Sequence, residues 1–371
     1  KTASATKVTS STTSMNNNFY YVAPNTSVEI NDTVSTGGTT HLILCDGSTL
    51  TCKKGIVVKR NSDFFIYGQN AQTGKLFAIG DHSDNEHVTA GIGDSSNFYS
   101  DDYIDYGNIT INGGIISATG GYWQNEQGTV AIGSPGIGGI DEFGEKLEGS
   151  ITINNGDVTA IGANKAAGIG GGGLGYSSNV NNYNSPALFS SITINGGTIK
   201  ATGGNYGAGI GGGRDNNAEN ITINGGTITA TATTNGTPGE TGGAGIGGGC
   251  GGNATNIKIT GGIVNTTGSP QGAGIGCGLN VDGLVKANGI TITGGKVTAK
   301  GGQGAAGIGG SFGCSAENIV INKGTIVSTP GADDQYFSIQ AAGIGNGAIG
   351  TAKTSSFSTD LDGKEGSAFI T

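Results

Sequence analysis

Short stretches of alternating apolar and polar residues recur along the chain, and a glycine pair closes most of them. Typical examples are "NITINGG" at Asn108 and "SITINGG" at Ser191. A period of two places both isoleucines on one face of an extended strand and threonine on the other. Segments such as "TIKAT" at Thr198 follow the glycine turn and alternate again. Each repeat therefore predicts two consecutive short strands.

A second phrase, "AGIG" or a close variant, follows each pair of predicted strands and supplies a third short strand with one apolar residue. Repeats are 29 to 42 residues long, which is typical of solenoids and propellers. All length variation enters at two positions, as expected of loops inserted into a coil of constant cross-section. We expect the isoleucines of the phrase to form a ladder in the core: Ile92, Ile137, Ile169, Ile210, Ile246, Ile275, Ile308 and Ile344.

Three short strands and three corners per coil predict an all-β fold, a parallel β-helix. The chain has 76 glycines among its 371 residues. In stacked coils, recurrent glycine can relieve crowding at a corner or adopt a positive φ in every coil. A phosphate-binding loop is disfavoured, because it needs a lysine and a following helix. We expect residues 1–25 to be an N-terminal segment, 26–88 a cap with irregular first coils, 89–350 the regular coils, and 351–371 a C-terminal cap.

Charge and composition exclude some classes of partner. The net charge of −9 disfavours nucleic acid. No run of 18 apolar residues exists, so no membrane insertion is expected. An odd number of cysteines, five, disfavours a disulfide framework in a chain of this length. We expect Cys250, Cys277 and Cys314 to be buried small side chains, whereas Cys45 and Cys52 either pair or both face the core.

The chain resembles the glycine-rich β-helix regions of secreted bacterial surface proteins. The resemblance rests on "HLILCDGSTLT" and "FFIYGQNAQTGKL", followed by the iterated "ITINGG" and "GAGIGGG" phrases, and it covers essentially residues 8–371. It implies a right-handed, single-stranded parallel β-helix, broadly similar to the pectate-lyase-like folds. It also implies an extracellular or cell-surface location and a role in adhesion or carbohydrate contact.

Aromatic residues beside acids and amides gather in the loops of the first coils that carry the AGIG phrase. Aromatic rings contact the apolar faces of sugars, and carboxylates and amides bind their hydroxyls. We therefore predict an adhesin or carbohydrate-binding module. The alternative interpretation is that these rings only cover the flank of the solenoid. The predicted ligand-binding residues are Tyr99, Asp101, Asp102, Tyr103, Tyr106, Tyr122, Trp123, Glu126, Tyr176 and Tyr183.

Catalysis is the alternative function. Glycosidic bond hydrolysis needs two carboxylates about 5 to 10 Å apart. The candidates for a glycoside hydrolase or polysaccharide lyase are Asp141, Glu142, Arg214 and Asp215, which follow the AGIG phrase in two coils. A structural stalk without a ligand is the third alternative. No cofactor is expected, although Asp81, Asp84 and Glu86 are weak candidates for a calcium site.

Overall fold

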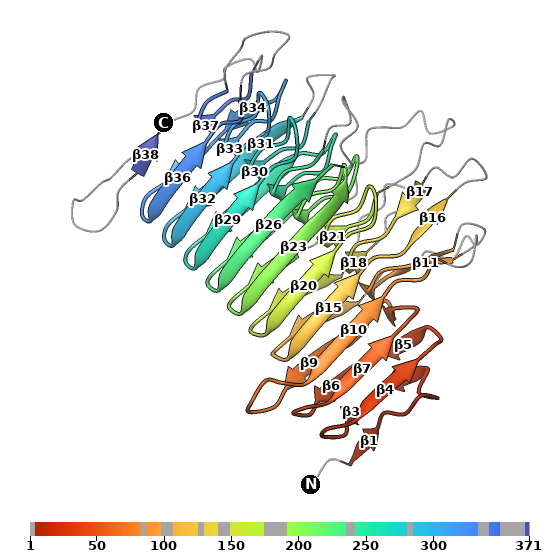
Figure 1. Cartoon of the computed structure of the whole chain (residues 1–371). Helices are drawn as coiled ribbons and strands as arrows, with labels where there is room; N and C mark the ends of the chain where they lie inside the picture. Colours follow the sequence, from red (N-terminus) through yellow and green to blue (C-terminus); the bar gives the residue numbers. More distant parts are fainter. Residues whose placement is uncertain are drawn as a thin grey trace.

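The computed structural model describes residues 4–82, 87–97, 107–124, 130–139, 149–173, 191–234, 242–279, 285–332, 341–348 and 368–370. Within these ranges the chain is a right-handed parallel β-helix, as the sequence predicts. The coils stack along one axis, and their strands form three parallel sheets that run along it (Figure 1). The chain passes from sheet 1 to sheet 2, then to sheet 3, and back to sheet 1 of the next coil. We name the corners 1–2, 2–3 and 3–1 accordingly.

Sheet 1 contains the "ITI" strands. In this sheet inward isoleucines alternate with outward threonines, as in Ile192, Thr193 and Ile194. Its strands are β1 (Ala5–Lys7), β3 (Phe19–Val22), β6 (Thr39–Leu44), β9 (Asp63–Gly68), β14 (Asn108–Ile111), β19 (Ser150–Ile153), β22 (Ser191–Ile194), β25 (Ala218–Ile223), β28 (Ala254–Ile259), β31 (Lys286–Ile292), β34 (Ser315–Glu317) and β35 (Val320–Ile321).

Sheet 2 contains the strands that follow the glycine turn. Ile199 and Ala201 are buried, while Thr198 and Lys200 face outward, so the predicted alternation is confirmed. Its strands are β4 (Ser27–Ile30), β7 (Thr49–Cys52), β10 (Lys75–Ile79), β15 (Ile115–Thr119), β20 (Asp157–Ile161), β23 (Thr198–Asn205), β26 (Thr227–Thr233), β29 (Ile263–Thr267), β32 (Lys296–Lys300), β36 (Thr325–Thr329) and β38 (Ala368–Ile370).

Sheet 3 contains the AGIG phrase, and most of its strands are only two or three residues long. All eight isoleucines of the predicted ladder are buried and lie in register across it. Its strands are β2 (Ser14–Asn16), β5 (Val34–Gly37), β8 (Ile56–Val58), β12 (Ile92–Gly93), β18 (Ile137–Gly139), β21 (Ile169–Gly171), β24 (Ile210–Gly211), β27 (Ile246–Gly247), β30 (Ile275–Gly276), β33 (Ile308–Gly309) and β37 (Ile344–Gly345).

The glycine after the ladder isoleucine has a positive φ, between 129° and 148°, in every AGIG strand. A Cβ atom at Gly211 would overlap with the carbonyl oxygen of Gly247 in the next coil. Both predicted reasons for the glycine therefore apply, because the backbone is left-handed and the neighbouring coil leaves no space for a side chain.

Corner 1–2 is held by a ladder of exposed asparagine side chains. The Nδ2 atom of Asn154 donates to Oδ1 of Asn112 at 2.8 Å, that of Asn195 to Asn154 at 2.7 Å, and that of Asn224 to Asn195 at 2.8 Å. Thr260 closes the series by donating from Oγ1 to Asn224 at 2.8 Å. The five coils from Asn112 to Thr260 are thus joined outside the core as well as inside it.

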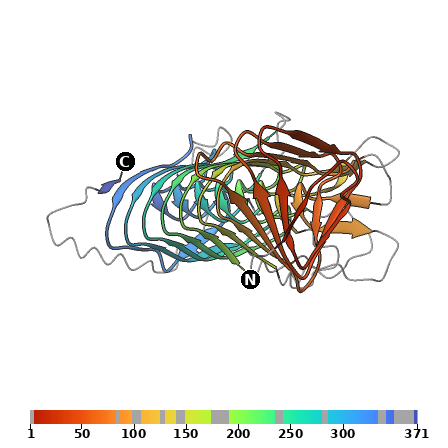
Figure 2. The ribbon, with the colours of Figure 1, turned by 90° about the horizontal axis from the view of Figure 1, so that it is seen from below.

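The first residues already form coils of the same three sheets, with β1 paired to β3 and β2 paired to β5. The view from below shows these coils stacked in front of the later ones (Figure 2). At the other end, β38 pairs with β36, and the rest of the predicted C-terminal cap lies outside the described residues. The proposed division into N-terminal segment, caps and regular coils stays a prediction. The described residues contain no helix long and apolar enough to cross a membrane.

None of the five cysteines is in a disulfide. Cys45 and Cys52 are both buried, so the second of the two predicted alternatives is correct for this pair. Cys277 and Cys314 are buried as predicted. The prediction for Cys250 is wrong, because this residue lies at corner 3–1 and is only half-buried.

Candidate functional site

Two antiparallel hairpins interrupt the parallel coils on one side of the molecule. β11 (His87–Thr89) and β13 (Ser95–Asn97) flank β12 and pair with each other, and β16 (Tyr122–Gln124) pairs with β17 (Val130–Gly133) at corner 2–3. β11 contacts β16. Figure 1 shows β11, β16 and β17 along the same edge of the solenoid. This edge is where the coils depart from their regular path, and such departures commonly carry function.

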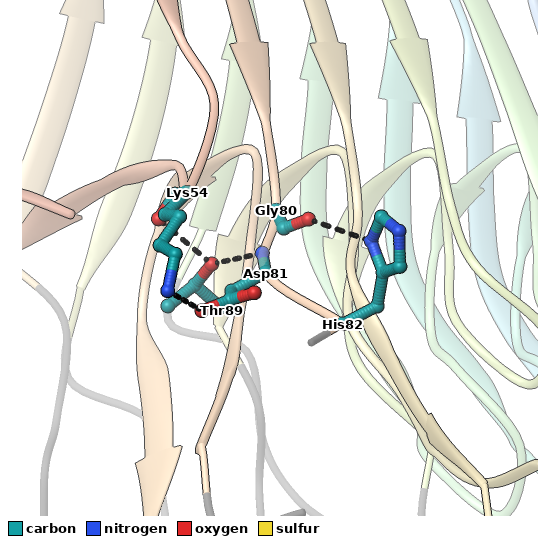
Figure 3. A network of polar contacts seen from close by, with 5 residues as sticks. All are labelled: Lys54, Gly80, Asp81, His82 and Thr89. Carbon is teal, nitrogen blue, oxygen red and sulfur yellow. Dashed lines mark hydrogen bonds and ion pairs between the residues drawn. The ribbon is translucent and has the colours of Figure 1, made fainter. Parts of the chain in front are cut away.

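Polar contacts fix the first coil of this edge (Figure 3). The Oγ1 atom of Thr89 accepts a hydrogen bond from the backbone N of Asp81 at 2.7 Å and donates to the carbonyl oxygen of Lys54 at 3.2 Å. Lys54 Nζ lies 3.2 Å from Oδ2 of the nearly buried Asp81. His82 Nδ1 lies 3.4 Å from the carbonyl oxygen of Gly80. Asp81 is therefore held by a cation and by its own backbone.

An aromatic pair continues the edge into the next coil. The rings of His82 and Tyr122 are stacked, with centroids 5.3 Å apart and an interplanar angle of 7°. Trp123 follows Tyr122 in β16 and lies opposite Ile132 of β17. Because successive residues of a strand point to opposite faces, Tyr122 and Trp123 lie on different faces of the hairpin. Both side chains are half-buried.

A second cluster lies on the same edge, in the second and third coils beyond the coil of His82. Lys165 and Tyr206 occupy equivalent positions at corner 2–3, both with positive φ, 74° and 70°. Arg214 at corner 3–1 reaches across the short sheet 3: its backbone N donates to the carbonyl oxygen of Lys165 at 2.7 Å, and its guanidinium carbon lies 4.8 Å from the centroid of the Tyr206 ring. Nε of Arg214 lies 3.4 Å from Oδ2 of Asp215.

Burial shifts the pKa values of Lys165 and Asp215, the two charged residues beside Arg214, in opposite directions. Lys165 is only 6% exposed, and burial together with the positive charge of Arg214 lowers its pKa, which Asp215 partly counteracts. Burial raises the pKa of Asp215, although Arg214 and Lys165 both act to lower it. Functional sites are enriched in groups with shifted pKa values, such as an amine with a lowered pKa beside a carboxyl with a raised pKa.

The two clusters are joined through backbone contacts. Tyr122 pairs with Gly133 across the hairpin, and Gly133 forms an antiparallel bridge with Gly173. Gly173 in turn lies directly against the backbone of Lys165. The edge is therefore continuous over four coils. We call it the corner row; its members are His82, Tyr122, Trp123, Lys165, Tyr206 and Arg214.

The structure places five of the predicted site residues at this edge: Tyr122, Trp123, Arg214, Asp215 and Asp81. Those that lie outside the described residues are Tyr99, Asp101, Asp102, Tyr103, Tyr106, Glu126, Tyr176, Tyr183, Asp141, Glu142, Asp84 and Glu86. The roles assigned to both groups stay predictions. Within the described ranges, no three His, Cys, Asp or Glu residues are grouped as metal ligands.

Sequence reasoning did not single out Lys165, Tyr206 and His82. A usable signal existed for two of them, because Lys165 and Tyr206 both precede the first glycine of their AGIG phrase by three residues. Gln271 and Gly304 share this offset and also have a positive φ, 64° in each. Lining up the residues before the phrase, and not only those after it, would have identified this column.

A second aromatic group was also missed, on the outer face of sheet 1. Phe19, His41 and Phe65 lie in register in three successive coils, and His41 is stacked between the two phenyl rings at 4.2 and 4.9 Å. His41 Nδ1 also lies 3.1 Å from the Tyr67 hydroxyl. The ring faces of this stack contact each other. Phe19 covers one face of His41 and Phe65 covers the other, whereas in the His82–Tyr122 pair each ring covers only one face of its partner, so we interpret the His41 column as a structural ladder.

These features define the class of protein: a parallel β-helix with a pectate-lyase-like repeat region and a decorated edge. A family model described as a beta helix repeat matches residues 151–173, 192–214, 257–279 and 290–312. Each matched segment passes through one strand of each sheet, so the repeat of the family is one coil of this structure. Neither the curated proteins nor the solved structures gave a match.

Proposed function

We propose that this chain is an extracellular β-helix that acts as an adhesin or carbohydrate-binding module, with the corner row as its binding surface. The observation that carries the proposal is the stacked His82–Tyr122 pair, which lies beside the Trp123 hairpin and next to the hydrogen-bonded Asp81. Aromatic rings with polar groups at their margin are the combination that sugar binding uses.

The geometry of the solenoid favours an extended polymer over a small sugar. Neighbouring coils lie about 4.8 Å apart, the spacing of strands in a sheet. Ring and charged groups from successive coils therefore follow one another along the axis at intervals comparable to the length of a sugar unit. Arg214 adds guanidinium donors at the far end of the row, where they can bind hydroxyl or carboxylate oxygens of a polysaccharide.

The test is affinity electrophoresis through gels that contain a panel of plant and host polysaccharides. One polymer is expected to retard the wild-type chain, and Trp123→Ala or Tyr122→Ala is expected to abolish the retardation. Because Trp123 is the single tryptophan, its fluorescence should also change when the same polymer is titrated. Absence of retardation by every polymer would contradict the proposal and favour a structural stalk.

A matched control distinguishes recognition from folding. Phe77 is an exposed aromatic residue, 37% accessible, on the outer face of sheet 2. Phe77→Ala removes an aromatic ring of similar size from a strand of the same coil as His82 without touching the corner row. Its retardation should equal that of the wild type. Circular dichroism of all variants checks that the β-helix is intact.

The alternative is a polysaccharide-cleaving enzyme, which the opposite pKa shifts at Lys165 and Asp215 support. A lysine with lowered pKa can act as a base, and a carboxyl with raised pKa can act as an acid. Staining the same gels for loss of polymer tests this alternative. Cleavage that disappears in both Asp215→Asn and Lys165→Gln would favour it, whereas retardation without loss of polymer would leave the binding module as the better account.

A further inference from the structure

Two thiols from neighbouring coils meet in the core at corner 3–1. Cys277 follows β30, and Cys314 lies after β33 in the next coil. Both side chains are fully buried, at 0% exposure. The two coils are in register at this level, since Ile275 pairs with Ile308 and Gly276 with Gly309. The thiols therefore belong to adjacent layers of the same stack.

One serine hydroxyl lies between the two sulfur atoms. Oγ of Ser311 lies 2.9 Å from Sγ of Cys314 and 3.6 Å from Sγ of Cys277. The backbone N of Ser311 donates to Sγ of Cys277 at 3.3 Å, and Sγ of Cys314 lies 3.6 Å from the carbonyl oxygen of Gly278. Each thiol thus reaches the same small region at the boundary between the coils.

This pair is specific to one boundary of the solenoid. By register, Cys277 occupies the position that Gly248 and Gly310 hold in the neighbouring coils. Cys314 stands two residues before the aligned Ala316, where an earlier coil has Asn216. Asn216 makes an equivalent contact, donating from Nδ2 to the carbonyl oxygen of Gly172 at 2.7 Å. Cys314 therefore occupies the position of a residue whose side chain hydrogen-bonds to the preceding coil.

We propose that Cys277 and Cys314 form an inter-coil disulfide when the protein meets a low-molecular-weight disulfide as oxidant. The Cys277 thiolate attacks one sulfur of the oxidant, which breaks the oxidant's S–S bond and releases one thiolate. The Cys314 thiolate then attacks Sγ of Cys277, forms the protein disulfide and releases the second thiolate. Two protein thiols are oxidised, one disulfide is reduced to two thiols, and both protons pass to the released thiolates.

The two thiols interact in the closed coils, where burial raises the pKa of Cys277 but hydrogen bonds from the Cys314 thiol and from Ser311 lower it by more. Because both thiols are buried, the exchange takes place while the C-terminal coils are open, during folding or local unfolding. Once closed, the bond would restrict the chain between the two cysteines and so oppose reopening.

Peptide mapping tests the proposal directly. The reduced chain is unfolded, then refolded with a mixture of reduced and oxidised glutathione, alkylated and digested with trypsin. Lys286, Lys296 and Lys300 separate the two cysteines, so the disulfide should join peptides 259–286 and 301–323 with the loss of two hydrogen atoms. Recovery of both peptides alkylated, carrying glutathione, or joined to another cysteine would overturn the proposal.

A second measurement relates the bond to stability of the coils. Oxidation should slow thermolysin cleavage of the C-terminal coils by about tenfold or more, since closing a loop of this length restricts the unfolded chain. Cys277→Ala and Cys314→Ser should remove this effect of oxidation. Cys250→Ser, in the half-buried thiol outside the pair, should keep it. Equal cleavage rates for oxidised and reduced wild type would contradict the proposed clamp.

Discussion

The N-terminal coils, residues 5–68, and the AGIG coils, residues 87–348, share three sheets but fill them differently. The N-terminal coils have large inward side chains such as Met15, Leu42 and Phe64. Their sheet 3 strands carry ordinary side chains, for example Val57. The AGIG coils instead have one isoleucine between glycines in sheet 3, and the described residues of their core cluster are small or β-branched.

The two types of coil meet where Val57 pairs with Gly93. From Gly93 onward the backbone after the ladder isoleucine turns left-handed, and its carbonyl oxygens lie where a side chain would be on the neighbouring coil. Glycine is therefore required in the AGIG coils because one coil stacks closely on the next. A coil of the N-terminal type pairs in the same sheet without a glycine at this position. Described hairpins project only from coils of the AGIG type or from their first boundary.

Gly247→Ala tests whether the AGIG coils need glycine at this position. The residue has a φ of 137°, and its Cβ would overlap with the carbonyl oxygen of Gly276. We expect a loss of about 4 kcal/mol or more in the free energy of unfolding, because backbone strain and a clash with rigid backbone act together. Chemical denaturation followed by circular dichroism measures the loss.

Gly289→Asn is the matched control for positive φ alone. Gly289 has a φ of 75° and no atom closer than 3.6 Å to its Cβ position. The equivalent residues of two neighbouring coils, Asn256 and Asn318, have φ values of 57° and 54°. This variant should unfold within about 1 kcal/mol of the wild type. If Gly247→Ala were equally mild, stacking would not be the reason for the glycine.

The stability of the N-terminal coils at alkaline pH depends on the buried thiol of Cys52. This residue pairs with Ile30 and Ala78, and burial raises the pKa of its thiol to about 12 from 9.0. Above pH 9 the unfolded chain loses this proton while the folded chain keeps it, so stability falls as pH rises. The expected loss is about 2 to 3 kcal/mol between neutral pH and pH 11. Urea denaturation at a series of pH values measures it.

Cys52→Ala isolates this thiol from the other groups that titrate at high pH. Alanine already occupies the same inward position in later coils, as Ala78, Ala118 and Ala160. The wild type should therefore lose stability relative to the variant as pH rises from 9 to 11. A difference that stays constant over this range would show that the thiol is not protected from ionisation.

The repeat pattern was sufficient to predict the strands, the Ile246 ladder and the role of Gly247, because every coil repeats the same local environment. The prediction that Cys250 is buried was wrong because this residue lies at corner 3–1, one of the two positions where the coils vary in length. The approach of Arg214 to Lys165 depends on a sheet 3 strand of only two residues, which brings two corners together across it. The His41 stack requires the register of coils that lack the AGIG phrase, and no sequence motif gives that register.

The smallest expected effect concerns the asparagine ladder, which starts only beyond the N-terminal coils. Asn195→Ala removes a donor to Asn154 and an acceptor for Asn224. Because these side chains are solvent-exposed or nearly so, water replaces their bonds, and we expect a loss of about 1 kcal/mol. Hydrogen exchange should show faster opening of the two adjoining coils. Thr229→Ala, on the outer face of sheet 2, should leave exchange unchanged, and equal exchange in both variants would mean that the ladder adds nothing to the core.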